Sequence, residues 1–91
     1  MALGKTKIYQ DAWTKIGDNV ATITFQNLGG NAMYVEFTAA DSAPTSTFGT
    51  IYNRFEGEMK KSLTDLTFVT SPAYVWARSL SGQTTVIHEG A

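Results

Sequence analysis

VATITFQNLGGNAMYVEFTA, residues 20–39, decides the fold because it contains two runs in which apolar and polar residues alternate. A period of two is typical of a strand that buries one face. Gly29 and Gly30 separate the runs, and glycine adopts the positive φ that a tight turn needs. The stretch therefore predicts a β-hairpin with strands at 20–27 and 32–39. Its predicted inward residues are Ala21, Ile23, Phe25, Met33, Val35 and Phe37.

A second pair of runs, AYVWARSLSGQTTVIHEG at residues 73–90, has the same organisation. Strand-forming residues occupy 73–80 and 83–89, and the turn formers Ser81 and Gly82 lie between them. The stretch therefore predicts a closing hairpin.

The first strand of this second pair is apolar on both faces. Tyr74 and Trp76 point one way, while Val75 and Ala77 point the other. A chain of 91 residues has only one core to fill. We therefore expect something outside that core, such as a neighbouring subunit, to cover the face of Tyr74 and Trp76.

The other segments are shorter and more varied. Residues 5–16 alternate, with Ile8, Ala12 and Ile16 on one face and Tyr9 and Trp13 on the other. We expect a surface loop at 40–50, a short strand within 48–55 and a further strand at 66–70.

Residues 55–66 allow two interpretations. Phe55, Met59, Leu63 and Leu66 recur at helical spacing, which favours a short helix. Gly57 and the threonines that follow oppose a stable helix, which favours strand, loop and strand.

Together these segments predict an all-β fold, a small antiparallel β-sandwich or barrel of about six to eight short strands with at most one short helix. We expect residues 1–91 to form a single domain. Residues 1–7 have little to bury, which predicts a flexible N-terminal arm.

Composition argues against several classes of function. The net charge is −1, and charged residues make up 16% of the chain, below the usual level of about 25%. A nucleic-acid partner favours a basic face, and a membrane span needs roughly 20 consecutive apolar residues, so we expect neither partner. The chain has no cysteine, and its opening residues turn polar at once, so we expect no disulfides, no secretory signal and synthesis in a reducing cytoplasm.

The residues that carry catalytic chemistry are scattered. His88 is the only histidine, and its neighbour Glu89 points to the opposite strand face, so the two cannot pair. Zinc would need three or four converging ligands. Glu56 and Glu58 share a face if extended, as a pair of glycosidase carboxylates would, but a chain this small leaves little room for a substrate cleft. We predict no enzyme activity, no metal and no cofactor.

Four residues are the predicted contacts for a protein partner: Trp13, Tyr74, Trp76 and Arg78. Trp and Tyr are enriched at interface cores, and each of these aromatic residues lies on a strand whose other face carries core-type residues. Arg78 shares the face of Tyr74 and Trp76 and could bind a carboxylate at the rim of the contact. Packing within the chain is the alternative for the three aromatic residues.

Both strand pairs resemble those of small structural proteins encoded by tailed phages and prophages. The stretch 20–44 is similar to their opening strand, Asn-x-Gly turn, strand and small polar loop, and 74–90 is similar to their closing strands. Glu56-Gly57-Glu58 resembles their Gly-Glu turn in mid-chain, although residues 55–70 are longer and more charged than the pattern.

The resemblance implies a virion component assembled in the host cytoplasm, first of all a capsid decoration (cement) protein. It would form homo-oligomers and bind a major capsid protein or another virion protein. Two alternatives stay open: a carbohydrate- or receptor-binding module of a tail fibre, with Trp13 or Trp76 stacked on sugar rings, and a component of a tail or head-completion ring.

Overall fold

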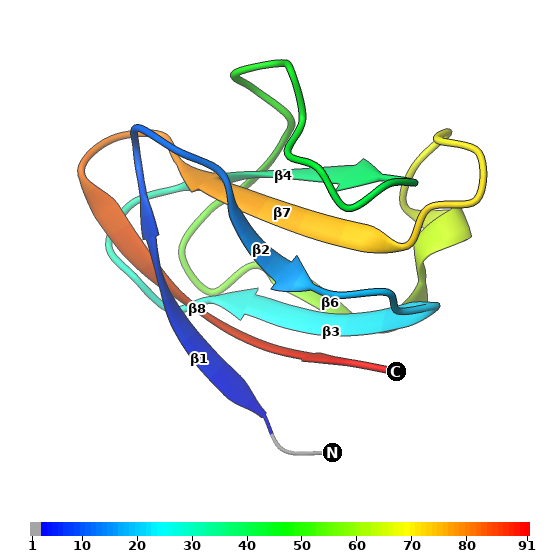
Figure 1. Cartoon of the computed structure of the whole chain (residues 1–91). Coiled ribbons are helices and arrows are strands. Elements are labelled where there is room, and N and C mark those ends of the chain that lie inside the picture. The colour runs from blue at the N-terminus through cyan, green and yellow to red at the C-terminus, as the bar shows by residue number, and fades with distance from the viewer. Residues whose placement is uncertain (1–2) are drawn as a thin grey trace.

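The structure, a computed structural model, describes residues 3–91 as two four-stranded antiparallel sheets packed face to face (Figure 1). Sheet A runs in the order β1 (Gly4–Tyr9), β8 (Gln83–Gly90), β3 (Thr22–Asn27) and β6 (Gly57–Ser62). Sheet B runs in the order β2 (Thr14–Gly17), β7 (Tyr74–Ser79), β4 (Met33–Thr38) and β5 (Thr50–Tyr52). Within residues 3–91 the helical structure is one 3-10 turn, η1 (Leu63–Asp65). The predicted all-β sandwich is confirmed.

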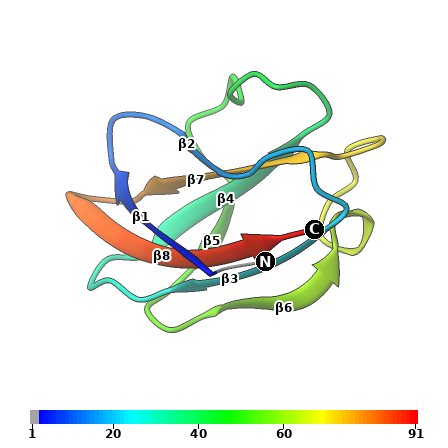
Figure 2. The same ribbon diagram turned by 60° about the horizontal axis from the view of Figure 1, so that its bottom comes forward.

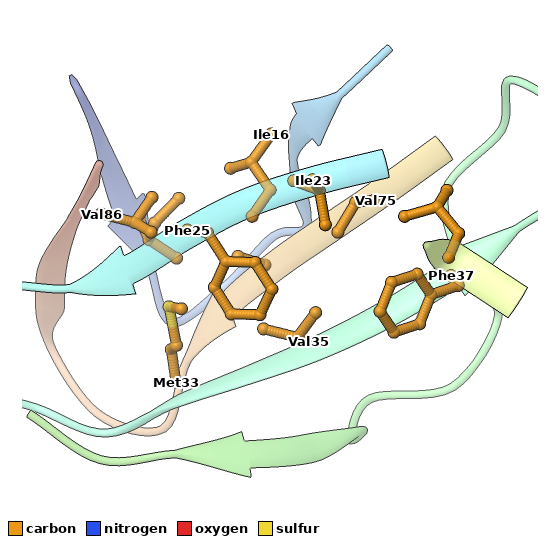
Figure 3. Close-up of a cluster of buried hydrophobic side chains, with 11 residues drawn as sticks. Ile16, Ile23, Phe25, Met33, Val35, Phe37, Val75 and Val86 are labelled. Atoms are coloured by element: carbon orange, nitrogen blue, oxygen red, sulfur yellow. The ribbon is translucent and has the colours of Figure 1, made fainter. Parts of the chain in front are cut away.

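The core lies between the two sheets and is built by the alternation seen in the sequence (Figure 3). In β3 and β4 every second residue is buried, which places Ile23 and Phe25 opposite Val35 and Phe37 across the interior. Burying these side chains is the main favourable contribution to folding. The core residues are Ile8, Ile16, Ile23, Phe25, Met33, Val35, Phe37, Leu63, Val75, Ala77 and Val86.

The strands of both predicted hairpins form, but the two strands of each pair do not bond to each other as a hairpin. The connection at 28–32 carries the chain from β3 in sheet A to β4 in sheet B, and the connection at 80–82 carries it from β7 in sheet B to β8 in sheet A (Figure 1). Three to five extended residues span about 10–17 Å, and packed sheets lie about 10 Å apart. A short connection therefore fits a crossing between sheets as well as a hairpin.

The glycines of the first connection act differently from the prediction. Positive φ among glycines is confined to Gly82, at 58°, so Gly29 and Gly30 do not form the expected turn. Gly29 instead allows close backbone approach, because a Cβ there would lie only 2.7 Å from the backbone nitrogen of Thr85. Gly30 has open space around it.

A buried asparagine holds this crossing in place. The side chain of Asn27 is fully buried at the end of β3. Its Nδ2 donates to the backbone oxygens of Asn31 and Tyr52, at 2.8 and 3.1 Å. Its Oδ1 accepts from the Thr84 hydroxyl at 2.7 Å and from the Gly29 amide at 3.1 Å. The network joins the connection to both sheets and leaves no polar atom of Asn27 unpaired.

Several finer expectations are corrected. Residues 57–62 form β6 and are followed by η1, so the helical spacing at 55–66 does not reflect a helix. Residues 66–70 lie outside the strands, because the chain there turns between β6 of one sheet and β7 of the other. Within the predicted arm, β1 begins at Gly4 and pairs along its whole length with β8. Residues 1–2 of the predicted arm lie outside the described residues.

Candidate interaction surface

The outer face of sheet B is covered by the chain's own loop 39–49, which connects β4 to β5. In both views the loop stands over sheet B on the side away from sheet A (Figures 1 and 2). The indole Nε1 of Trp13 donates to the backbone oxygen of Ser46 at 2.8 Å. The Nζ of Lys15 lies 2.8 Å from the Oδ1 of Asp41. These two contacts fasten the loop to β2 and to the residue before it.

Trp76 is shielded from water in this arrangement. Its side chain points to the outer face of sheet B, as predicted, yet the residue is only 8% exposed. The Nζ of Lys15 lies 5.9 Å from the centroid of the Trp76 ring and 5.5 Å from that of Tyr74, so one cation contacts both rings. The expectation that a neighbouring subunit covers Trp76 is therefore wrong, because the same chain already covers it.

The other three predicted contacts lie on the same side of the molecule and are half-buried. Tyr74 lies beside Trp76 through their shared contact with Lys15. Trp13 is engaged with the loop, and the Nε of Arg78 donates to the backbone oxygen of Gln10 at 2.6 Å. The structure thus brings Tyr74 and Trp76 together and uses all four residues in contacts within the chain.

An open apolar surface lies on the other side, over the outer face of sheet A. A groove of about 370 Å³, called here the sheet A groove, is lined by Leu3, Thr24, Phe25, Gln26, Phe55, Gly57, Glu58, Met59 and Ile87. Three large apolar side chains at its walls are more than half exposed: Leu3 at 53%, Phe55 at 59% and Met59 at 76%. Water-exposed apolar side chains that gather around one hollow make this groove a candidate binding site.

Irregular backbone places these side chains in the groove. Phe55 has a φ of 70°, and its amide donates to the backbone oxygen of Asn27. Lys60 has a φ of 49°, at the point where the register between β3 and β6 shifts. Both are non-glycine residues in the left-handed region, which costs about 1–3 kcal/mol each. Such a bulge redirects the side chains next to it, here that of Met59.

Charged groups surround the groove. The Arg54 guanidinium lies 4.7 Å from the centroid of the Phe55 ring. Lys5 pairs directly with Ile87, so its side chain emerges on the same outer face as that groove residue. Lys60 and Glu89 both line an adjoining hollow of about 270 Å³ on this face. Glu58 lines the groove itself, and Glu56 follows Phe55 in the sequence. The groove therefore has an apolar centre and charges of both signs around it.

The two carboxylates considered as a catalytic pair bind different groups. The Oε1 of Glu56 accepts from the Asn53 amide at 2.7 Å, whereas the Oε2 of Glu58 accepts from the Tyr52 hydroxyl at 3.0 Å. Burial, and next the hydrogen bond to Glu58, raise the pKa of Tyr52 well above its usual 10. Tyr52 also packs edge-on against Phe25, with ring centroids 4.9 Å apart. The arrangement fits a structural anchor for β5.

His88 lies at the edge of the core. Its Nε2 and the Thr6 hydroxyl share a 2.8 Å hydrogen bond between β8 and β1, and burial lowers its pKa below 6.5. Within residues 3–91 no three His, Asp or Glu side chains gather as metal ligands would. The same part of the chain contains no helix of the length and apolarity needed to cross a membrane.

The sequence prediction missed the sheet A groove because the spacing of Phe55 and Met59 fits one face of a short helix as well as a strand. One signal could have identified them: each is flanked by charged residues, Arg54 and Glu56 around Phe55 and Glu58 and Lys60 around Met59. Comparison with family models, with curated proteins and with solved structures finds no match to this chain.

Proposed function

We propose that this chain is a structural protein of a phage virion, a capsid decoration protein that strengthens the outside of the head shell. The observation that carries the proposal is the sheet A groove, where Leu3, Phe55 and Met59 are more than half exposed. Apolar side chains held in the open favour burial against another protein of the particle. The resemblance of residues 20–90 to small phage structural proteins supports a structural role in a virion.

The size of the molecule is adequate for this role. A stable specific contact buries about 800 Å² on each partner. The described chain has 5116 Å² of accessible surface, so one such contact would use roughly a sixth of it. The loop-covered side with Trp76 and the groove side are separate, which leaves room for more than one contact per copy.

The sugar-binding alternative has less support. A platform for sugar stacking needs an exposed aromatic face, whereas Trp76 is 8% exposed and Trp13 is fastened to loop 39–49. The groove residues offer Phe55, but its ring already contacts Arg54.

The direct test is immunogold electron microscopy of particles from the phage or prophage that encodes the chain. Label on the head shell is the expected result. Label confined to the tail or fibres would overturn the decoration role, and a particle without the protein would overturn the virion role.

A second experiment tests the groove. Met59→Glu should lower incorporation into particles at least about tenfold, because a buried unpaired charge is costly. Phe68→Glu is the matched control, since Phe68 is fully exposed on the connection between η1 and β7 and away from the groove. Equal incorporation of Met59→Glu and wild type would show that the groove is not a docking surface.

A further inference from the structure

Loop 39–49 stands over the outer face of sheet B but contributes nothing to the core (Figures 1 and 2). The core residues of the described chain all come from the strands and from η1. Within the loop, Pro44, Ser46 and Gly49 are half-buried and the other residues are exposed, including Phe48 at 65%. A segment that buries so little apolar surface opens at low cost compared with the sandwich beneath it.

One cation joins this loop to two aromatic rings. The Nζ of Lys15 donates to the Oδ1 of Asp41 at 2.8 Å, and the same ammonium lies over the rings of Tyr74 and Trp76. The hydrogen bond to Asp41 is the first cause of a raised pKa at Lys15, so the side chain stays charged in this contact. The carboxylate is 53% exposed, and water and salt therefore compete with the pair.

Two further hydrogen bonds join the loop to tryptophan side chains. The Trp13 indole donates to the backbone oxygen of Ser46 at 2.8 Å. The Thr38 hydroxyl accepts from the Trp76 indole and donates to the backbone oxygen of Ala40, both at 2.8 Å. Together with the bond from Lys15, these are the side-chain hydrogen bonds between the loop and the rest of the described chain. Each one therefore ends at an aromatic ring or one group away from it.

We propose that loop 39–49 is a lid, which opens as one unit and exposes the rings of Tyr74 and Trp76 to water while the sandwich stays folded. No second sheet lies over this outer face in residues 3–91, so the cover of Trp76 comes from the loop and from the Lys15 side chain that the loop holds. The loop begins with Ala39 and ends at Gly49, small residues of the kind that hinges use.

Opening breaks the pair of Lys15 with Asp41 and the bond from Trp13 to Ser46, called here the latch. An exposed ion pair and one neutral hydrogen bond are weak ties, so a minor open population exists beside the closed one. Because half of the latch is an exposed ion pair, salt shifts the balance toward the open form. The lid does not depend on the proposed virion role or on the sheet A groove.

Native-state hydrogen exchange measured by NMR tests the lid in the whole chain. The Trp76 indole proton should exchange through a small opening, so its rate should hardly change with low urea. The slowest backbone amides of β3 and β4 exchange through global unfolding and should accelerate steeply with urea, because more surface is exposed. An indole rate that rises with urea in parallel with these amides would overturn the proposal.

Two substitutions separate the lid from the core. Asp41→Asn removes the charge of the latch and should speed exchange of the Trp76 indole about two- to fivefold, the range for an exposed ion pair. Ile23→Val weakens the core without touching the loop and should speed only the slowest amides, by about two- to tenfold. An indole that responds to Ile23→Val as those amides do would show that Trp76 is exposed only by global unfolding.

Asp18→Asn is the matched control for charge. Asp18 also lies near the Lys15 ammonium, at 3.5 Å, but it belongs to the turn after β2 and not to the loop, so its loss should leave the indole rate unchanged. Salt raised from about 50 to 500 mM should speed indole exchange in wild type and not in Asp41→Asn. Equal effects of Asp18→Asn and Asp41→Asn, or no effect of Asp41→Asn, would exclude the latch.

Discussion

The indole Nε1 of Trp76 donates a hydrogen bond to the Oγ1 of Thr38 at 2.8 Å. The two residues lie on neighbouring strands, β7 and β4, on the outer face of sheet B, where a tryptophan would ordinarily meet water. The polar tip of the ring is satisfied within the chain, and the apolar body is covered. Sheet B therefore has packed side chains on both faces.

Trp76→Ala is expected to lower the free energy of unfolding by about 3 kcal/mol, as for other large-to-small changes in a core. Thr38→Val removes this acceptor together with the hydrogen bond that the Thr38 hydroxyl donates to the backbone oxygen of Ala40, and should cost about 1–2 kcal/mol. Urea unfolding of both variants measures the two values. A Trp76→Ala protein as stable as wild type would mean that the ring is not packed as described.

Gly29 and Gly30 should respond differently to alanine. A Cβ at Gly29 would collide with the backbone of β8, so Gly29→Ala should destabilise by more than about 1 kcal/mol. Gly30→Ala meets open space and should change stability by less than about 0.5 kcal/mol. Thermal melts of the two variants side by side decide the matter, and a reversed order would refute the described path of residues 28–32.

Asn27→Ala should be among the most damaging polar substitutions. It removes the Oδ1 that accepts from both the Thr84 hydroxyl and the Gly29 amide inside the protein, and it leaves an unfilled space. We expect a loss of about 2–4 kcal/mol. Asn53→Ala, at an exposed position, is the control and should be near neutral. Similar midpoints in urea for both variants would contradict the network.

Acid should destabilise the fold through His88. Burial lowers its pKa in the folded chain below the value of about 6.5 expected when unfolded. Between these two values the unfolded chain binds more protons, so the stability present above about pH 6.5 is lost as the pH falls toward the folded pKa. His88→Gln does not titrate. The melting temperature of wild type should therefore fall more steeply than that of His88→Gln below pH 6.5, and parallel curves would show that His88 contributes nothing.

The sequence predicted strands well where one face is buried. The alternation in 20–27 and 32–39 identified the inward residues Ile23, Phe25 and Val35 correctly, because burial imposes the period directly. It could not assign strands to sheets, since the same alternation and the same connection length fit both a hairpin and a crossing. Pairing partners such as β1 with β8 are more than 70 residues apart and leave no local signal.

The cover of sheet B is harder to predict. The expectation for Trp13, Tyr74, Trp76 and Arg78 assumes that a small chain leaves its second apolar face open. Loop 39–49 covers it, but its small polar residues give no periodic signal of packing. The groove depends on left-handed backbone at Phe55 and Lys60, and neither residue type predicts that conformation.

The pairing of the first strand with the last has a consequence for biosynthesis. Gly4 of β1 lies opposite His88 of β8, and the chain changes sheet at every connection except that between β4 and β5. Sheet A therefore cannot close until β8 has left the ribosome. With so few pairings between neighbouring segments, folding should be slow for a chain this small, on the order of milliseconds to seconds. Newly made copies would hold an unpaired β1 edge in the meantime, with Lys5 and Lys7 to discourage it from joining other strands.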